Sequence, residues 1–180
     1  MAQLQAAFVS TFPPRKCGLA TFTADLMQAI AGLGVWPEPQ AVAITHADNQ
    51  LEYDHRVRFE IIQEEESSYT AAANWLNRAP VDVVMIEHEY GIFGGTNGAY
   101  VLTLLKHLKK PALVTLHTVL PRPDRARADI IRALAAGSEG LVVLAHKGRD
   151  LLVRRYGIPG EKIHMIRHGV PAAPAATAEE

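Results

Sequence analysis

Apolar stretches rich in β-forming residues recur along the chain and alternate with segments of helical apolar spacing. The strand-like stretches are Leu4 to Val9, Ala41 to Thr45, Val57 to Ile62, Val81 to Ile86, Ala112 to Leu116, Leu141 to Ala145 and Lys162 to Ile166. Nearly continuous apolar strands indicate burial on both faces, and intervening helices are typical of parallel strands joined by crossovers. The pattern predicts a Rossmann-like three-layer α/β domain with a mainly parallel sheet of about seven strands.

The segments between the strands differ in kind. An apolar residue every three to four positions predicts helices around two sets of residues: Phe22, Leu26, Ile30 and Leu33, and Tyr100, Leu104, Leu105 and Leu108. The link from Asp48 to His55 is polar, lacks this spacing and is too short for a packed helix, so a loop is expected there. Residues 171–180 are small, contain prolines and lack large apolar side chains, which predicts a linker or a frayed tail after a domain that spans residues 1–170.

Composition and charge limit the classes of binding partner and the cellular compartment that the sequence favours. Eighteen basic and nineteen acidic residues leave a net charge of −1, which argues against a nucleic-acid footprint or a membrane-surface patch. The lone Cys17 excludes an internal disulfide, and neither a membrane-length apolar stretch nor a signal-like segment is visible. A cytoplasmic location is the expectation.

Polar residues cluster where three of the predicted strands end: Ser10 to Gly18, Glu87 to Gly95, and Thr115 to Thr118. In α/β sheets ligands bind at the carboxyl ends of strands, so these three segments predict one shared binding rim. Around Gly18, backbone amides at a helix start would suit an anion, although the loop is neither G-x-G-x-x-G nor a Walker A motif. Alternatively, Gly18 only permits a tight turn.

The second segment offers carboxylates and an imidazole suited to sugar hydroxyls, with Gly94 and Gly95 allowing a close backbone approach. Adjacent side chains of an extended segment alternate in direction, so Glu87, His88 and Glu89 are a poor metal site, and ordinary loop charges are the alternative.

His117 ends an apolar strand and is the strongest candidate among the histidines, with a hydrogen-bonded structural residue as the alternative. His46 is a weaker candidate of the same kind. His164 is expected to be structural, and His55, His107 and His146 are expected to face solvent.

Four motifs together resemble the N-terminal domain of family-4 retaining glycosyltransferases over residues 4 to 171. They are Phe12-Pro13-Pro14 with Gly18-Leu19-Ala20, His88-Glu89-Tyr90-Gly91-Ile92-Phe93-Gly94-Gly95, Thr115-Leu116-His117-Thr118 and His168-Gly169-Val170-Pro171. The resemblance implies one half of a GT-B architecture, in which two Rossmann-like domains face each other across the active site. The C-terminal donor-binding domain is absent from this chain, so the isolated half is expected to be inactive.

The resemblance also implies a function and residue roles. The complete enzyme would transfer a hexose from a nucleotide-sugar to a hydroxylated acceptor with retention, using neither a metal nor another cofactor. His117 matches the catalytic histidine that contacts the donor sugar, and Gly18 and Leu19 match the backbone donors to its phosphate. The acceptor side corresponds to Lys16, His88, Glu89, Tyr90, Gly94 and Gly95. Two departures from the family pattern are Lys16-Cys17-Gly18 in place of paired glycines and Arg167 in place of a proline.

Two alternatives stay open at this point. One is a nucleotide-sugar epimerase of the same architecture, and the other is a non-catalytic module that binds a carbohydrate or a protein. A cleft face without its opposing domain could also support self-association.

Overall fold

The computed structural model describes residues 4–48 and 50–170, and the expected linker at 171–180 lies outside the described residues. The strands are β1 (Ala6–Ser10), β2 (Gln40–Thr45), β3 (Val57–Ile62), β4 (Val83–His88), β5 (Ala112–Leu116), β6 (Gly140–Val143) and β7 (Ile163–Met165). The helices are α1 (Gly18–Gly32), α2 (Glu66–Arg78), α3 (Tyr100–His107), α4 (Arg125–Gly137) and α5 (His146–Leu151), with the shorter turns η1 (Thr96–Gly98), η2 (Leu152–Tyr156) and η3 (Gly160–Lys162). Each of the seven predicted strands is confirmed, with ends shifted by a few residues. The described residues between β2 and β3 form neither helix nor strand, as expected for the loop.

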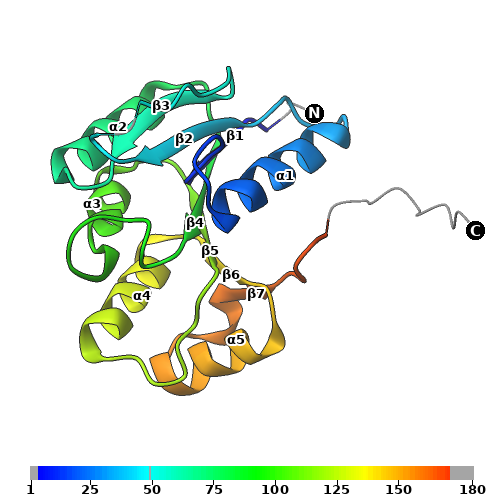
Figure 1. The fold of residues 1–180 in the computed structure, drawn as a ribbon. Helices are drawn as coiled ribbons and strands as arrows, with labels where there is room; N and C mark the ends of the chain where they lie inside the picture. The colour runs from blue at the N-terminus through cyan, green and yellow to red at the C-terminus, as the bar shows by residue number, and fades with distance from the viewer. Residues whose placement is uncertain (1–3, 49, 171–180) are drawn as a thin grey trace, which may run out of the picture.

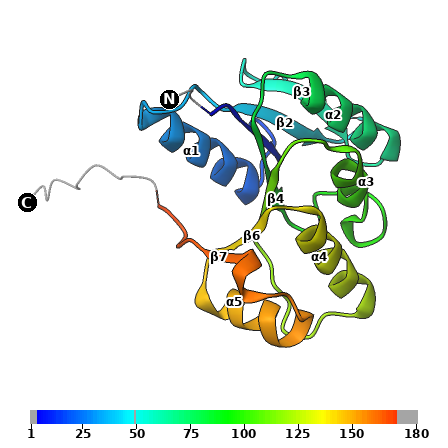
Figure 2. The same cartoon turned by 180° about the vertical axis from the view of Figure 1, so that it is seen from behind.

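The strands form one parallel sheet in the order β3-β2-β1-β4-β5-β6-β7 (Figures 1 and 2). The chain adds strands outward in one direction from β1 to β3 and in the other direction from β4 to β7. The direction therefore reverses between β1 and β4, and ligands of open α/β sheets bind at the carboxyl ends of strands beside such a reversal.

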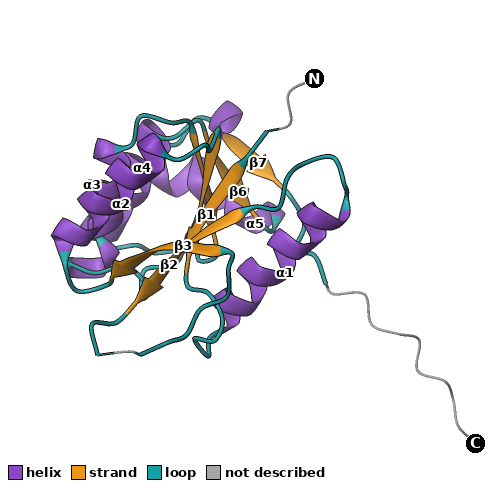
Figure 3. Cartoon of the chain, turned by 90° about the horizontal axis from the view of Figure 1, so that it is seen from above, coloured by secondary structure: helices purple, strands orange, loops and turns teal. Residues whose placement is uncertain are grey.

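Successive residues of a strand belong alternately to two separate hydrophobic clusters, one on each face of the sheet. In β1, Ala7 and Val9 belong to the larger cluster, whereas Ala6 and Phe8 belong to the smaller one. The larger cluster packs under α2, α3 and α4, and the smaller cluster packs under α1 (Figure 3). Since strand side chains alternate in direction, this two-sided burial produces the nearly continuous apolar strands and confirms the three-layer fold.

In α3, Leu104 and Leu105 are buried as the apolar spacing predicted, whereas Leu108 lies just beyond the helix as its C-cap. In α1 the result differs: the helix ends at Gly32, and Leu33 lies beyond it with 69% of its surface exposed. The buried α1 residues are Ala20, Thr23 and Met27, so small and polar side chains take part in the contact with the sheet.

Candidate functional site at the carboxyl edge of the sheet

The candidate site begins where β1 leads into α1. Cys17 is the N-cap of α1, and its Sγ accepts a hydrogen bond of 3.3 Å from the Ala20 N–H. The preceding N–H groups, of Gly18 and Leu19, belong to the first helical turn and have no intrahelical acceptor. Gly18 and Lys16 are exposed and Leu19 is partly exposed. N–H groups at a helix N-terminus favour an anion, so this turn is a candidate anion site.

A buried carboxylate and a histidine form the second part of the site. Glu87 is fully buried in β4, and its Oε2 accepts a hydrogen bond of 2.8 Å from Nε2 of His117, the residue after β5. Thr115 of β5 donates to the other carboxylate oxygen of Glu87 at 3.3 Å. The apolar pattern predicted a strand end at Ile86, whereas β4 extends to His88 and includes Glu87. The donors from Thr115 and His117 compensate the buried carboxylate.

The helix and the histidine are connected through Phe22. Its ring lies one helical turn beyond Gly18 and contacts the His117 ring edge-to-face, with centroids 4.7 Å apart. Phe22 also contacts His168, which follows β7, at 5.1 Å. Phe22 of α1, His117 and His168 near the end of the described chain therefore meet on the α1 side of the sheet.

The side chains of Glu89 and Thr118 are joined by a hydrogen bond in which the Thr118 hydroxyl donates. Glu89 also accepts a hydrogen bond of 2.9 Å from the Tyr90 N–H. Both carboxylate oxygens thus have partners within the protein, although the side chain is only partly buried. The carboxylate ties the loop after β4 to the loop after β5.

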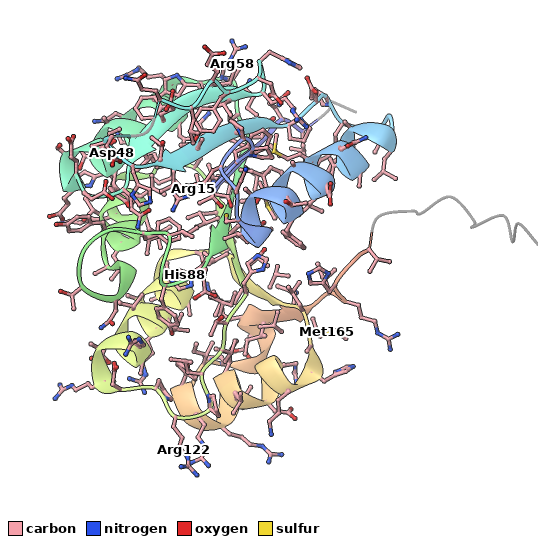
Figure 4. All side chains as sticks on the ribbon, in the orientation of Figure 1. Arg15, Asp48, Arg58, His88, Arg122 and Met165 are labelled. Atoms are coloured by element: carbon pink, nitrogen blue, oxygen red, sulfur yellow. The ribbon has the colours of Figure 1, made fainter. Side chains whose placement is uncertain are left out.

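His88 lies on the opposite face of the sheet from Glu87. Its ring is buried, stacks on Phe93 with centroids 5.7 Å apart and contacts Tyr90 edge-to-face at 5.1 Å. Burial lowers the pKa of His88 to about 4, with a smaller contribution from the His117 charge. Figure 4 shows His88 near the middle of the molecule. The structure gives His88 no exposed surface on which to meet an acceptor, and the hydroxyl of Tyr90 is buried as well.

The two glycines of the motif make internal contacts. A Cβ on Gly94 would lie 1.8 Å from the Gln63 carbonyl oxygen, and a Cβ on Gly95 would lie 2.7 Å from the Tyr100 ring. The Gly94 N–H donates to the Tyr69 hydroxyl at 2.8 Å, and this hydroxyl donates to the Gln63 carbonyl at 3.0 Å. The close backbone approach that the glycines permit is therefore to the end of β3 and to α3.

A second network at the same edge of the sheet was not expected from the sequence. Arg15 donates to the Ile44 carbonyl at 2.9 Å, to the His46 ring at 3.1 Å and to the Gln63 side chain at 3.1 Å. Gln63 in turn donates to the Gly91 carbonyl at 3.1 Å. Arg15, labelled in Figure 4, thus links the loops after β1, β2, β3 and β4. His46 belongs to this network and also pairs with Glu64.

The other histidines lie outside the site. His55, His107 and His146 are exposed, as expected. His164 lies in the edge strand β7 and is also exposed, with its ring against Gly140. Within residues 4–48 and 50–170, no three His, Cys, Asp or Glu side chains gather in a way that could hold a metal ion.

Two surface hollows, of about 390 and 360 Å³, are lined by other residues than the candidate site residues. The first is lined by arginines of the loop after β5, of α4 and of η2, and the second by residues of α1 and the loop before β3.

Fold and rim together define a Rossmann-like half-domain of the kind found in GT-B glycosyltransferases. Residues 17–173 match the model of Glycosyltransferase Family 4, and the chain belongs to that family. No curated protein matches the sequence.

Several solved structures share the fold. A glycosyltransferase from Rickettsia africae ESF-5 is 16% identical with a TM-score of 0.63, over 94% of this chain and 44% of that one. Anabaena HepE, solved with UDP and glucose, is 10% identical with a TM-score of 0.61, over 93% of this chain and 45% of that one. An α-glucosyltransferase, solved with UDP and a 13-mer DNA, is 14% identical with a TM-score of 0.51, over 81% of this chain and 38% of that one.

The chain thus spans less than half the length of each of these proteins. Among the described residues, no helix has the length and apolar character that a bilayer crossing requires.

Proposed function

We propose that this chain is the acceptor-side half of a retaining glycosyltransferase, which transfers a hexose from a nucleotide-sugar to a hydroxylated acceptor. The observation that carries the proposal is the contact between Phe22, in the first turns of α1, and His117, beside the reversal between β1 and β4. The second domain, which would supply most of the donor site, lies outside this chain, and the isolated half is inactive.

The chemistry explains why such a rim suffices on this side of the cleft. Glycosyl transfer proceeds through an oxocarbenium-like transition state while a nucleoside diphosphate departs. Oriented dipoles that are already in place stabilise such developing charges most effectively. In this proposal the amides of Gly18 and Leu19 face the departing phosphate, and His117 orients the donor sugar.

The acceptor side is assigned to the exposed part of the same rim. Lys16, Glu89 and Gly95 retain exposed surface there, whereas His88 and Gly94 act through packing. The first assays should use UDP-sugars as donors, because two of the similar structures contain UDP.

The test uses the complete two-domain protein with a panel of UDP-hexoses and hydroxylated acceptors. We expect His117→Ala to reduce kcat by roughly 100-fold, as for the loss of an oriented polar contact in the transition state. His107→Ala is the matched control, because His107 is an exposed histidine at the far end of α3. Turnover of H117A within about twofold of the wild type would remove His117 from the mechanism.

Product analysis tests the reaction class. A retaining transferase forms product only when an acceptor is present, and the product keeps the anomeric configuration of the donor. Interconversion of nucleotide-sugars without an acceptor would identify an epimerase instead.

A further inference from the structure

We propose that Glu87 is a positioning residue that holds His117 in the tautomer with its proton on Nε2. In this state Nδ1 faces the rim as a hydrogen-bond acceptor, so His117 receives a ligand hydroxyl and does not donate to a phosphate oxygen. The identity of that hydroxyl, as one of the sugar, rests on the proposed function; the tautomer does not.

The carboxylate determines which ring nitrogen is protonated. An ionised carboxylate only accepts hydrogen bonds, and Oε2 of Glu87 lies 2.8 Å from Nε2 of His117. A neutral imidazole has a single N–H, so donation through Nε2 leaves a lone pair on Nδ1. Thr115 donates to the other oxygen of Glu87, which gives the fully buried carboxylate two donors.

Contacts with the Glu87 carboxylate, the His88 carbonyl and the Phe22 ring hold the His117 ring in this orientation. Glu87 and Thr115 are register partners in β4 and β5, and His117 follows two residues later on the same side of the strand. The His117 N–H donates to the His88 carbonyl at 3.1 Å, which fixes the backbone. The ring of Phe22, from α1, contacts the His117 ring in a T-shaped arrangement. A half-turn of the ring about Cβ–Cγ would put the carbon Cε1 in the place of Nε2 and break the bond to Glu87.

The free nitrogen is open to a ligand. Within the described part of the chain, His117 Nδ1 has no hydrogen-bond partner, and it is not one of the buried unpaired atoms. The His117 side chain keeps 15% of its surface exposed. Nδ1 therefore reaches the surface of the rim.

The two parts of the rim then differ in what they bind. The N–H groups of Gly18 and Leu19 donate and suit phosphate oxygens, whereas the lone pair of His117 repels those oxygens and attracts an O–H group. Since Phe22 spans the two, a ligand with both a phosphate and hydroxyl groups has only one matching orientation.

The first experiment measures the tautomer of His117 in the ¹⁵N-labelled chain by two-bond and three-bond ¹H–¹⁵N correlations at pH 7.5, with His117→Gln to assign the signals. We expect the Nε2–H pattern in the wild type and a mixture of tautomers in Glu87→Ala. Glu66→Ala is the matched control: it removes an exposed carboxylate outside the site, which accepts from the Thr103 hydroxyl, and should leave the tautomer unchanged.

A wild-type ring with its proton on Nδ1, or an unchanged tautomer in E87A, would overturn the proposal. The wild-type spectrum decides the question even if E87A does not fold. This experiment does not depend on transfer activity, so it can fail while the proposed function stands, and the reverse also holds.

The second experiment compares kinetics in the two-domain protein. E87A should lower kcat by roughly 10- to 100-fold with a smaller effect on KM, because a misplaced contact matters most in the transition state. E66A should stay within about twofold of the wild type. An E87A variant with wild-type kcat would contradict the positioning role.

Discussion

Glu87 and His117 are 30 residues apart in the chain, yet their Oε2 and Nε2 atoms lie 2.8 Å apart across neighbouring strands. The pair depends on the register that sets Glu87 opposite Thr115. It places a charge-assisted hydrogen bond in a fully buried position, where losing one partner leaves the other uncompensated.

We expect this pair to be strongly coupled in a double-mutant cycle of Glu87→Ala, His117→Ala and the double variant. Each single variant should lose about 2 kcal/mol of unfolding free energy, and the double variant should lose about 1–2 kcal/mol less than the sum. Urea unfolding of all four proteins at pH 7.5 gives the coupling. Additive losses would show that the two side chains do not interact in solution.

The buried His88 should make stability depend on pH. Its pKa is about 4 in the folded protein, below the ordinary value of 6.5. Between these values the unfolded state binds more protons, so stability is full above pH 6.5 and falls as the pH drops towards 4. Lowering the pH from 7.5 to 5 should cost about 2 kcal/mol through this residue.

The measurement for His88 is urea unfolding of the wild type and His88→Leu at both pH values. The variant should lack this part of the pH dependence, and at pH 7.5 the removal of an unpaired buried imidazole should cost little. Equal losses on acidification in both proteins would mean that His88 is solvated in the native state.

Gly94 and Gly91 offer a matched pair of glycines within one loop. A Cβ on Gly94 would collide with the Gln63 carbonyl, whereas a Cβ on Gly91 meets nothing within 4 Å. Gly94→Ala should therefore lose about 2 kcal/mol or more, and Gly91→Ala should stay within about 0.5 kcal/mol of the wild type. Thermal and urea unfolding check this, and equal stability of the two variants would contradict the packing role of Gly94.

The stability of the protein should tolerate serine at position 17 better than alanine. Its Sγ caps α1 through the Ala20 N–H and lies 3.0 Å from the Thr11 hydroxyl. Ser is a preferred N-cap residue, so Cys17→Ser should keep or slightly raise the stability, whereas Cys17→Ala should lose about 1 kcal/mol. Unfolding midpoints of the two variants decide between a cap and a residue without a structural role.

Arg15 should order several loops at once. Arg15→Met removes donors to Ile44, His46 and Gln63, and we expect a loss of about 1–3 kcal/mol with faster amide exchange in the loops after β1, β2 and β3. Lys16→Met is the control, because the neighbouring Lys16 is exposed. Exchange rates that rise equally in both variants would show that Arg15 does not hold these loops.

The fold was largely predictable because its signals are local. Apolar stretches buried on both faces mark each strand, and the polar residues after β1, β4 and β5 mark the binding edge of a parallel sheet. The candidate site was less predictable from the sequence. His117, Gly18 and Leu19 were predicted, whereas the roles of Glu87, Phe22 and Arg15 were not, since each role consists of contacts with residues on other elements.

The sequence by itself determined the order and type of the elements and the sheet edge at which its polar motifs gather, because hydrophobic periodicity and strand polarity are properties of short segments. Only the tertiary structure decided that Glu87 turns towards α1 and pairs with His117, while His88 turns towards Phe93 on the other face. The physical reason is that alternation sets neighbouring residues on opposite sides, but the strand order and register choose the partners that each side meets.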